Sequence, residues 1–340
     1  MTVSNFRGGQ QSSALVIRLA RIREAAIVVL LIIIIAVVTV IEPRFLSTFN
    51  IRSVLLWAPL LTVVAMGEMM VIIIRGIDVS VGAILGFAGI VVGMIFRDNP
   101  GFNIYLGTLL GILIGAALGA INGVLIAWVK IPPVITTLGT LSVYRGLVFI
   151  VSGGRQIDPN HIPTELIRWS QRGPFGSQLI PWVVVIALAV AALAYLFLRY
   201  TKAGRNVYAL GSNPDAASLR GIPVSRTQFI VYTITGALAG LAGILYASRY
   251  GFVNPGETGV GFELTVIAAV VLGGTNVFGG SGSVIGVVLG CLLLGTINVA
   301  LAVLGVAATW QLAVYGIVIL LTVIVDAIVQ RQIRRLITGE

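Results

Sequence analysis

Charged side chains are scarce in this sequence. They make up 10% of its 340 residues, whereas a soluble globular domain carries about 25%. Hydrophobic residues account for 58% and gather in runs of about twenty, the length of an α-helix that crosses a bilayer. The composition therefore excludes a soluble domain and predicts an all-α, polytopic bundle of about ten transmembrane helices.

Cysteine and histidine are almost absent, with one of each in the chain. The single Cys291 lies inside an apolar run and excludes a disulfide framework or a thiol pair. The single His161 has no second histidine or cysteine at metal-ligand spacing. No catalytic, cofactor-binding or metal-binding residue is predicted, and the chain is not expected to be an enzyme.

A phosphate-binding loop is also missing. That motif ends in Lys-Ser or Lys-Thr, but the only lysines, Lys130 and Lys202, are followed by Ile and Ala. If nucleotide hydrolysis powers this protein, another polypeptide supplies the nucleotide-binding site. The net charge of +10 does not indicate nucleic acid, because the basic residues flank apolar runs and membrane topology explains them.

The apolar runs predict ten spans. The first, which follows three arginines, resembles a signal sequence but has no small-residue cleavage site, so an uncleaved helix is expected. Two joins, near 75–82 and 273–282, are rich in glycine and are compatible with re-entrant segments. The predicted spans are 25–41, 54–74, 80–96, 104–129, 134–151, 180–198, 228–248, 262–278, 283–304 and 310–329.

The distribution of Lys and Arg predicts the orientation, because cytoplasmic segments carry an excess of both. With the N-terminus inside, fourteen lie on the inner side: Arg7, Arg18, Arg21, Arg23, Arg75, Lys130, Arg199, Lys202, Arg205, Arg220, Arg226, Arg331, Arg334 and Arg335. Seven lie outside: Arg44, Arg52, Arg97, Arg155, Arg168, Arg172 and Arg249. The predicted cytoplasmic parts are 1–24, the loop 199–227 and the tail 330–340, around a permease domain at 25–329. Segment 152–179 is the main external loop.

The loop 199–227 contains the signals of a short, capped helix. Asn213 is at the N-cap position, Pro214 at the first helical position and Asp215 in the first turn. Gly221 follows at C′, with Pro223 beyond it. Because two turns of isolated helix are unstable in water, this element is either a docking piece or an ordinary capped loop helix.

Glycine recurs at the spacing that lets helix backbones approach closely in lipid. The longest series lines one face of the fourth span: Gly107, Gly111, Gly115, Gly119 and Gly123. The same spacing recurs at Gly82/Gly86, Gly89/Gly93, Gly236/Gly240 and Gly282/Gly286/Gly290. These residues are interpreted as packing positions of a compact bundle.

Polar side chains at membrane depth are costly and are functional candidates by default. The candidates for a translocation pathway are Glu68, Asp78, Ser80, Asn122, Arg145, Glu263 and Asn298. An alternative holds for several of them, namely that they pair or hydrogen-bond to fix helix packing. For Glu68, Glu263, Asn122 and Asn298 the packing role is the preferred interpretation.

Four stretches resemble a known family. They are Arg75-Gly-Ile-Asp-Val-Ser-Val-Gly82, Thr137-Leu-Gly-Thr-Leu-Ser-Val-Tyr-Arg-Gly146, the loop Gly204–Gly221, and Glu263–Gly274 together with Gly279–Gly286. The chain resembles the permease subunit of the ribose/xylose/galactoside class of bacterial ABC importers over nearly its whole length. Thr258–Leu264 and Ser248-Arg-Tyr250 are closest to the rhamnose and autoinducer-2 branches.

The resemblance implies a multi-pass protein of the bacterial inner membrane that imports a monosaccharide or a related small neutral polyol. It implies two permeases, identical or paralogous, two cytoplasmic ATPase subunits, a periplasmic sugar-binding protein and no cofactor. The capped helix would be the ATPase-coupling element, formed by Asn213, Asp215, Ala216, Ala217, Leu219 and Gly221, with Ala216 and Ala217 entering a groove on the ATPase. Asp78 and Ser80 match the family's Gly-Ile-Asp-x-Ser motif, as part of the pathway or as a turn cap.

Two alternatives remain open. A permease for branched-chain amino acids shares the broad architecture and differs in the ligand of its binding protein. A secondary carrier would need no ATPase and would respond to a protonophore.

Overall fold

The computed structural model describes residues 24–177 and 179–307, and beyond these only residues 310, 313, 314, 316, 317, 320 and 324. Every element in the described part is a helix, and the one β-bridge there joins Ile157 to Val253. The predicted class, an all-α polytopic bundle, is therefore confirmed. The predicted tail 330–340 and almost all of segment 1–24 lie outside the described residues.

Eight of the described helices are long and apolar enough to cross a membrane. They are Glu24–Ile41, α2 (Thr48–Ile73), α3 (Val81–Asp98), α4 (Ile104–Ala127), α5 (Pro133–Ser152), α7 (Trp182–Tyr200), α10 (Val224–Tyr250) and α12 (Val284–Val303). Shorter elements connect them: η1 (Pro43–Leu46), η2 (Pro159–His161), α6 (Thr164–Gln171), η3 (Pro174–Gly176), α8 (Lys202–Ser212), α9 (Pro214–Leu219) and α11 (Phe262–Leu272).

The predicted span 262–278 is wrong in its length. Helix α11 ends at Leu272 after 11 residues, which is about 16 Å of helix and roughly half of the hydrocarbon core. A turn at Gly273–Gly274 stops it, with Gly274 in the left-handed region at φ 84°. The tenth predicted span, 310–329, lies almost entirely on residues outside the described part.

The segment before α11 is irregular and partly buried: Val253, Thr258 and Gly259 are buried, whereas Val260 is 60% exposed. After α10 ends at Tyr250, Val253 pairs with Ile157, and Thr258 and Gly259 then pass along α3. A Cβ on Gly86 or Gly82 would collide with the carbonyl oxygens of Thr258 and Gly259, respectively. These two glycines of α3 therefore pack against a run of turns and not against another helix. Thr258 and Gly259 are enclosed by protein, the condition under which irregular backbone is tolerated in a membrane.

Helix α2 is the centre of the bundle. From Ala58 to Ile73 every one of its residues is buried, and it packs against α10, α12, α7 and α11. A helix that is apolar on all sides is expected in the core and not on the surface. Glu68, the one charged side chain of this buried stretch, is 0% exposed.

The α4–α10 contact confirms the glycine prediction for the fourth span. Gly111, Gly115 and Gly119 of α4 face Gly236 and Gly240 of α10 so closely that a Cβ on any of them would collide with the other helix, at Gly111 with a side chain. Without side chains between them, the two backbones touch, and van der Waals packing replaces the hydrophobic effect as the source of attraction in lipid.

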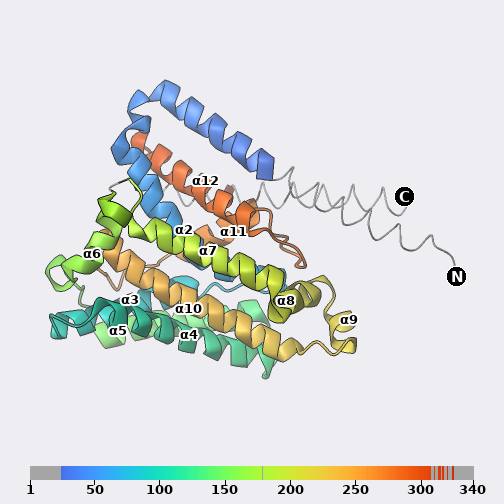
Figure 1. Ribbon diagram of the computed structural model, residues 1–340. Coiled ribbons are helices and arrows are strands. Elements are labelled where there is room, and N and C mark those ends of the chain that lie inside the picture. Colours follow the sequence, from blue (N-terminus) through green and yellow to red (C-terminus); the bar gives the residue numbers. More distant parts are fainter. Residues whose placement is uncertain are drawn as a thin grey trace.

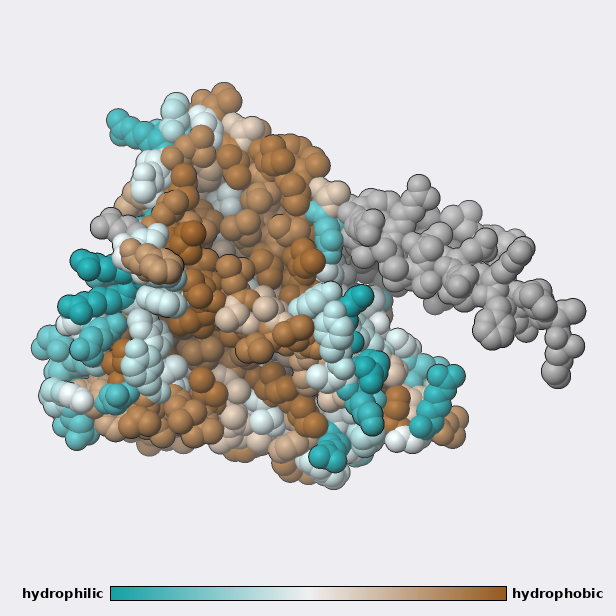
Figure 2. Space-filling view, viewed as in Figure 1, coloured by the Kyte–Doolittle hydropathy of each residue, from teal (hydrophilic) through white to brown (hydrophobic). Residues whose placement is uncertain are grey.

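The two ends of the bundle differ in their elements. Figure 1 shows α6 at one end and α8 with α9 at the other, with the long helices running between them. In Figure 2, hydrophobic side chains cover the middle of the visible face and hydrophilic ones gather at the two ends. Large apolar residues on α4, α5 and α7 are exposed, including Leu113, Ile150 and Leu193. The protein is thus built as a multi-pass membrane protein.

Candidate functional site

The loop helix α9 has the caps that its sequence predicts. The side chain of Asn213 accepts a hydrogen bond from the Ala216 amide at 3.0 Å, and Pro214 occupies the first turn. At the other end the amide of Ile222 donates to the Ala217 carbonyl and that of Gly221 to the Ser218 carbonyl. Gly221 has φ 76°, so this is a Schellman cap that requires glycine.

The structure places α9 at the tip of one end of the bundle (Figure 1), and it changes which residues of α9 are available to a partner. Ala217 is 3% exposed and Ala216 is half-buried. Leu219, in contrast, is 90% exposed and stands beside the exposed Asp215 and Ser218. Ala216 and Ala217, the residues expected to dock, are therefore less exposed than the outer side of α9, which carries Leu219.

Helix α8 was missed by the sequence reasoning, which treated residues 202–212 as loop. Its signals are the N-cap Thr201, whose side chain accepts from the Gly204 amide at 2.9 Å, and Val207 and Leu210, which are buried on one face. Asn213 ends α8 and also begins α9. The two helices are therefore joined through one residue without a flexible linker.

Four of the candidate pathway residues form one buried polar cluster: Glu68, Asp78, Ser80 and Asn122. All four side chains are 0% exposed. The Asp78 amide donates to Glu68 Oε1 at 3.0 Å. Asp78 Oδ1 accepts from the Ser80 amide at 2.9 Å and from Ser80 Oγ at 2.6 Å. Asn122 Nδ2 donates to Ser80 Oγ at 2.8 Å. The cluster connects the start of α3 to α2 and α4.

Three further residues surround this cluster, and the sequence reasoning did not single them out. The Tyr144 hydroxyl donates to the Leu118 carbonyl at 2.9 Å and lies 3.5 Å from Asn122 Oδ1. Thr137 Oγ1 donates to the Ile77 carbonyl at 3.1 Å. Tyr232 is fully buried on α10, and its hydroxyl occupies the space that a Cβ on Gly76 would need. Thr137 and Tyr144 belong to a stretch that carries the family resemblance, which was the available signal.

The cluster is not fully paired. Glu68 Oε2, Asp78 Oδ2 and the Tyr232 hydroxyl are buried without a hydrogen-bond partner. Uncompensated polar atoms in a protein interior are costly. Such atoms in a native structure call for a reason, and a role in a conformational change is one of them.

Arg145 and Glu263 form a second group, beside Gly82 and Gly86 of α3. Arg145 Nη1 donates to the Thr258 carbonyl at 2.7 Å. Glu263 lies at the start of α11, with Oε2 2.5 Å from the place of a Cβ on Gly82. Both side chains are half-buried. They flank the irregular segment that leads into α11.

Asn298, the last of the candidates, lies half-buried on α12, which packs against α2 and α11. Among the described residues, no group of three or more His, Cys, Asp or Glu side chains could hold a metal ion. The cluster around Asp78 offers hydrogen bonds and two carboxylates.

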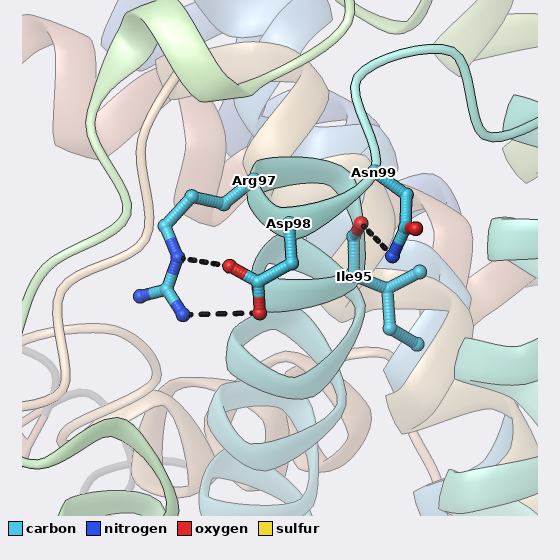
Figure 3. Close-up of polar contacts among 4 residues, drawn as sticks. All are labelled: Ile95, Arg97, Asp98 and Asn99. Atoms are coloured by element: carbon cyan, nitrogen blue, oxygen red, sulfur yellow. Dashed lines mark hydrogen bonds and ion pairs between the residues drawn. The ribbon is translucent and has the colours of Figure 1, made fainter.

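The end of the bundle opposite α9 carries a hollow of about 700 Å³ between the α3–α4 turn and residues 160–169. Charges of both signs border it. Arg97 pairs with Asp98 at 2.8 Å (Figure 3), and Glu165 and Arg168 line the other side. Both members of the Arg97–Asp98 pair are partly exposed, so the hollow is accessible from water.

Comparison with known proteins places these features in a family. The model of the family described as branched-chain amino acid transport system / permease component matches residues 50–323. No solved structure matches the chain with statistical significance.

Curated relatives align over most of their length. The autoinducer 2 import system permease protein LsrC of Photorhabdus luminescens is 37% identical over 304 residues, covering 89% of each chain. LsrC of Escherichia coli O9:H4 is 36% identical over 299 residues, covering 87% of this chain and 85% of its own. LsrC of Yersinia enterocolitica is 35% identical over 317 residues, covering 92% and 86%.

Proposed function

The chain belongs to the family of branched-chain amino acid transport system permease components, and we propose that it is the membrane-spanning subunit of an ABC importer for a small neutral sugar-like solute. Similarity to autoinducer 2 import permeases over most of both chains carries this proposal. Autoinducer 2 itself, a monosaccharide such as rhamnose or ribose, or a related small neutral polyol is the proposed solute. A neutral solute suits an interior that offers hydrogen-bonding groups such as Ser80 and Asn122.

The energy comes from separate ATPase subunits that dock on α9. Leu219, the most exposed large apolar residue of this polar end, is the proposed anchor in a groove of the ATPase. A capped helix of six residues holds this anchor in a fixed direction, which lowers the entropy lost on docking. A periplasmic binding protein delivers the solute to the opposite end, where the hollow beside Arg97 and Asp98 lies.

The proposed mechanism is alternating access. ATP binding closes the two ATPases, α9 moves with them, and the helices of two permease chains open the path alternately to the periplasm and to the cytoplasm. The second permease is an identical or a paralogous chain. The membrane is the bacterial inner membrane, and this chain itself hydrolyses no ATP.

Uptake by the assembled system tests the proposal. The chain is co-expressed with its ATPase and binding protein and reconstituted into proteoliposomes, and uptake of labelled autoinducer 2, rhamnose, ribose and leucine is measured. We expect ATP-dependent uptake of one of the first three. Uptake of leucine alone would replace the proposal by an amino acid permease. Uptake that needs no ATP and collapses with a protonophore would replace it by a secondary carrier.

A matched pair of variants tests docking on α9. Leu219→Glu is expected to reduce co-purification of the ATPase at least tenfold, because a charge replaces the apolar anchor. Phe175→Glu is the control, since Phe175 is also highly exposed but lies next to α6 at the other end of the bundle. Equal ATPase binding by both variants would contradict the assignment of α9.

A further inference from the structure

Three segments that are far apart in the sequence meet beside α9. They are the end of α2 at Ile73–Arg75, the end of α8 at Gly211–Ser212, and the Gly279–Gly280 turn between α11 and α12. The Gly280 amide donates to the Ile73 carbonyl at 2.9 Å, and a Cβ on Gly280 would lie 3.0 Å from Ser212 Cα. A Cβ on Gly211 would collide with the Ile73 carbonyl. The three backbones touch, so no layer of side chains can absorb a displacement.

The side chain of Arg75 links the end of α2 to the end of α8 by two hydrogen bonds. Its Nε donates to the Gly211 carbonyl and its Nη2 to the Ser212 carbonyl, both at 2.7 Å. These carbonyls belong to the last turn of α8, where the helix leaves acceptors unpaired and its dipole favours a positive charge. Arg75 itself has φ 65°, a backbone conformation that a non-glycine residue adopts only when its surroundings enforce it.

The α8 side of the junction leads directly to the ATPase-facing helix. The residue after Ser212 is Asn213, which ends α8 and caps α9. The Tyr208 hydroxyl donates to the Gly282 carbonyl at 3.1 Å, and burial raises the pKa of this hydroxyl, so it stays a donor. A movement of α9 therefore reaches the two carbonyls that Arg75 holds.

The other side of Arg75 leads to the buried cluster. Only Gly76 and Ile77 separate Arg75 from Asp78. This connection is too short to absorb a displacement of Arg75. Thr137 holds the Ile77 carbonyl, and the Tyr232 hydroxyl fills the space beside Gly76. Asp78 then bonds Glu68 through its amide and Ser80 through its carboxylate. A pull on the Arg75 guanidinium is thus transmitted to the cluster with its unpaired carboxylate oxygens.

We propose that Arg75 is the positioning residue that links movement of α9 to the cluster of Glu68, Asp78, Ser80 and Asn122, and that this link couples ATP hydrolysis to opening of the path. The proposal rests on the proposed function, since it presumes a motor that moves α9. It adds a specific route. The route begins with the two charge-assisted hydrogen bonds from Arg75 to α8 and ends at the buried hydrogen bonds of Asp78.

The test uses the complete transporter in nanodiscs, with ATP plus vanadate as the probe and hydrogen–deuterium exchange as the readout. In the wild type we expect the nucleotide to change exchange both in α8–α9 and in residues 76–80. In Arg75→Ala the change in α8–α9 persists, whereas the change in residues 76–80 is lost. In proteoliposomes, solute transported per ATP hydrolysed falls at least tenfold.

Two matched variants separate the link from general effects. Arg75→Lys keeps the charge and the assembly but presents no planar fork, so transport per ATP is expected to lie between wild type and Arg75→Ala. Arg205→Ala removes the same charge from the exposed face of α8, where the guanidinium bonds only the Tyr200 carbonyl. It is expected to keep wild-type coupling.

Several outcomes would overturn the assignment. If Arg75→Ala keeps the nucleotide-dependent change in residues 76–80 and the wild-type transport per ATP, the link does not pass through Arg75. If both Arg75 variants lose the ATPase altogether, Arg75 serves assembly only. The wild-type arm reports separately on the proposed function, because a wild type without ATP-driven uptake refutes the importer whatever the variants do.

Discussion

Asp78 uses a single carboxylate oxygen to accept two hydrogen bonds from Ser80, one from the amide and one from the hydroxyl. This is an Asx-turn, and α3 starts at Val81, the residue after Ser80. The other oxygen has no partner. One oxygen of Asp78 therefore forms the turn, and the other is an unpaired acceptor in the core. A neutral side chain can form the turn, whereas a function of the second oxygen in the pathway would depend on the carboxylate.

Replacement of Asp78 separates these roles. Asp78→Asn retains an oxygen that can accept both hydrogen bonds, so we expect thermal stability in detergent within about 1 kcal/mol of wild type. Asp78→Ala leaves the Ser80 donors unpaired and is expected to cost about 1–3 kcal/mol. Transport by Asp78→Asn is the informative measurement. Wild-type uptake supports the turn cap, whereas a stable protein without uptake supports a function of the carboxylate in the pathway.

At the scale of elements, glycine decides how the helices pack. On α4 and α10 it brings two helix backbones into contact, and on α3 it makes room for the irregular segment before α11. The same spacing thus serves two different neighbours. The consequence differs from one glycine to the next, since some face open space, such as Gly139 on α5.

Alanine substitutions at matched glycines test this packing. Gly115→Ala puts a methyl group against the carbonyl oxygen of Gly236, and overpacking of this kind costs about 1–3 kcal/mol. Gly139→Ala meets nothing within 4 Å and is the control. We expect a lower unfolding temperature for Gly115→Ala only, measured by thermal aggregation of the purified protein. Equal unfolding temperatures would contradict the backbone contact between α4 and α10.

At the scale of the whole molecule, the apolar belt between two polar ends fixes the axis of the bundle in the membrane, and the distribution of Lys and Arg predicts its direction. The end with α8 and α9 carries Lys202, Arg205 and Arg220 among others. An ATPase in the cytoplasm can dock on α9 only if this end faces inward. The proposed function therefore requires that the end with α8 and α9 faces the cytoplasm, which is also what the distribution of Lys and Arg predicts.

Cysteine labelling tests the orientation. The native Cys291 is buried and is expected to remain silent toward a membrane-impermeant thiol reagent. We expect a cysteine at the exposed Arg155 to react on intact spheroplasts, and a cysteine at Ser218 on α9 to react only after the membrane is permeabilised. The reverse pattern would place α9 outside and rule out an ATPase on that surface.

The sequence by itself determined the features that depend on neighbours along the chain. Runs of apolar residues located eight of the spans to within a few residues at most ends, and the caps of α9 were readable because Asn213, Pro214 and Gly221 act within one turn. The sequence also showed a set of polar residues at membrane depth that includes Glu68, Asp78, Ser80 and Asn122. It did not show the hydrogen bonds among them.

Tertiary structure decided what depends on residues distant in the sequence. Hydropathy is the same for a residue that faces lipid and for one that faces protein, so it extended α11 beyond the turn at Gly273–Gly274. No local pattern showed that Ala217 of α9 is buried. Arg75 and Gly211 are 136 positions apart, and only the packing of α2 against α8 brings them together. Local patterns specify helices and caps, whereas the contact that could transmit movement exists only once the bundle has formed.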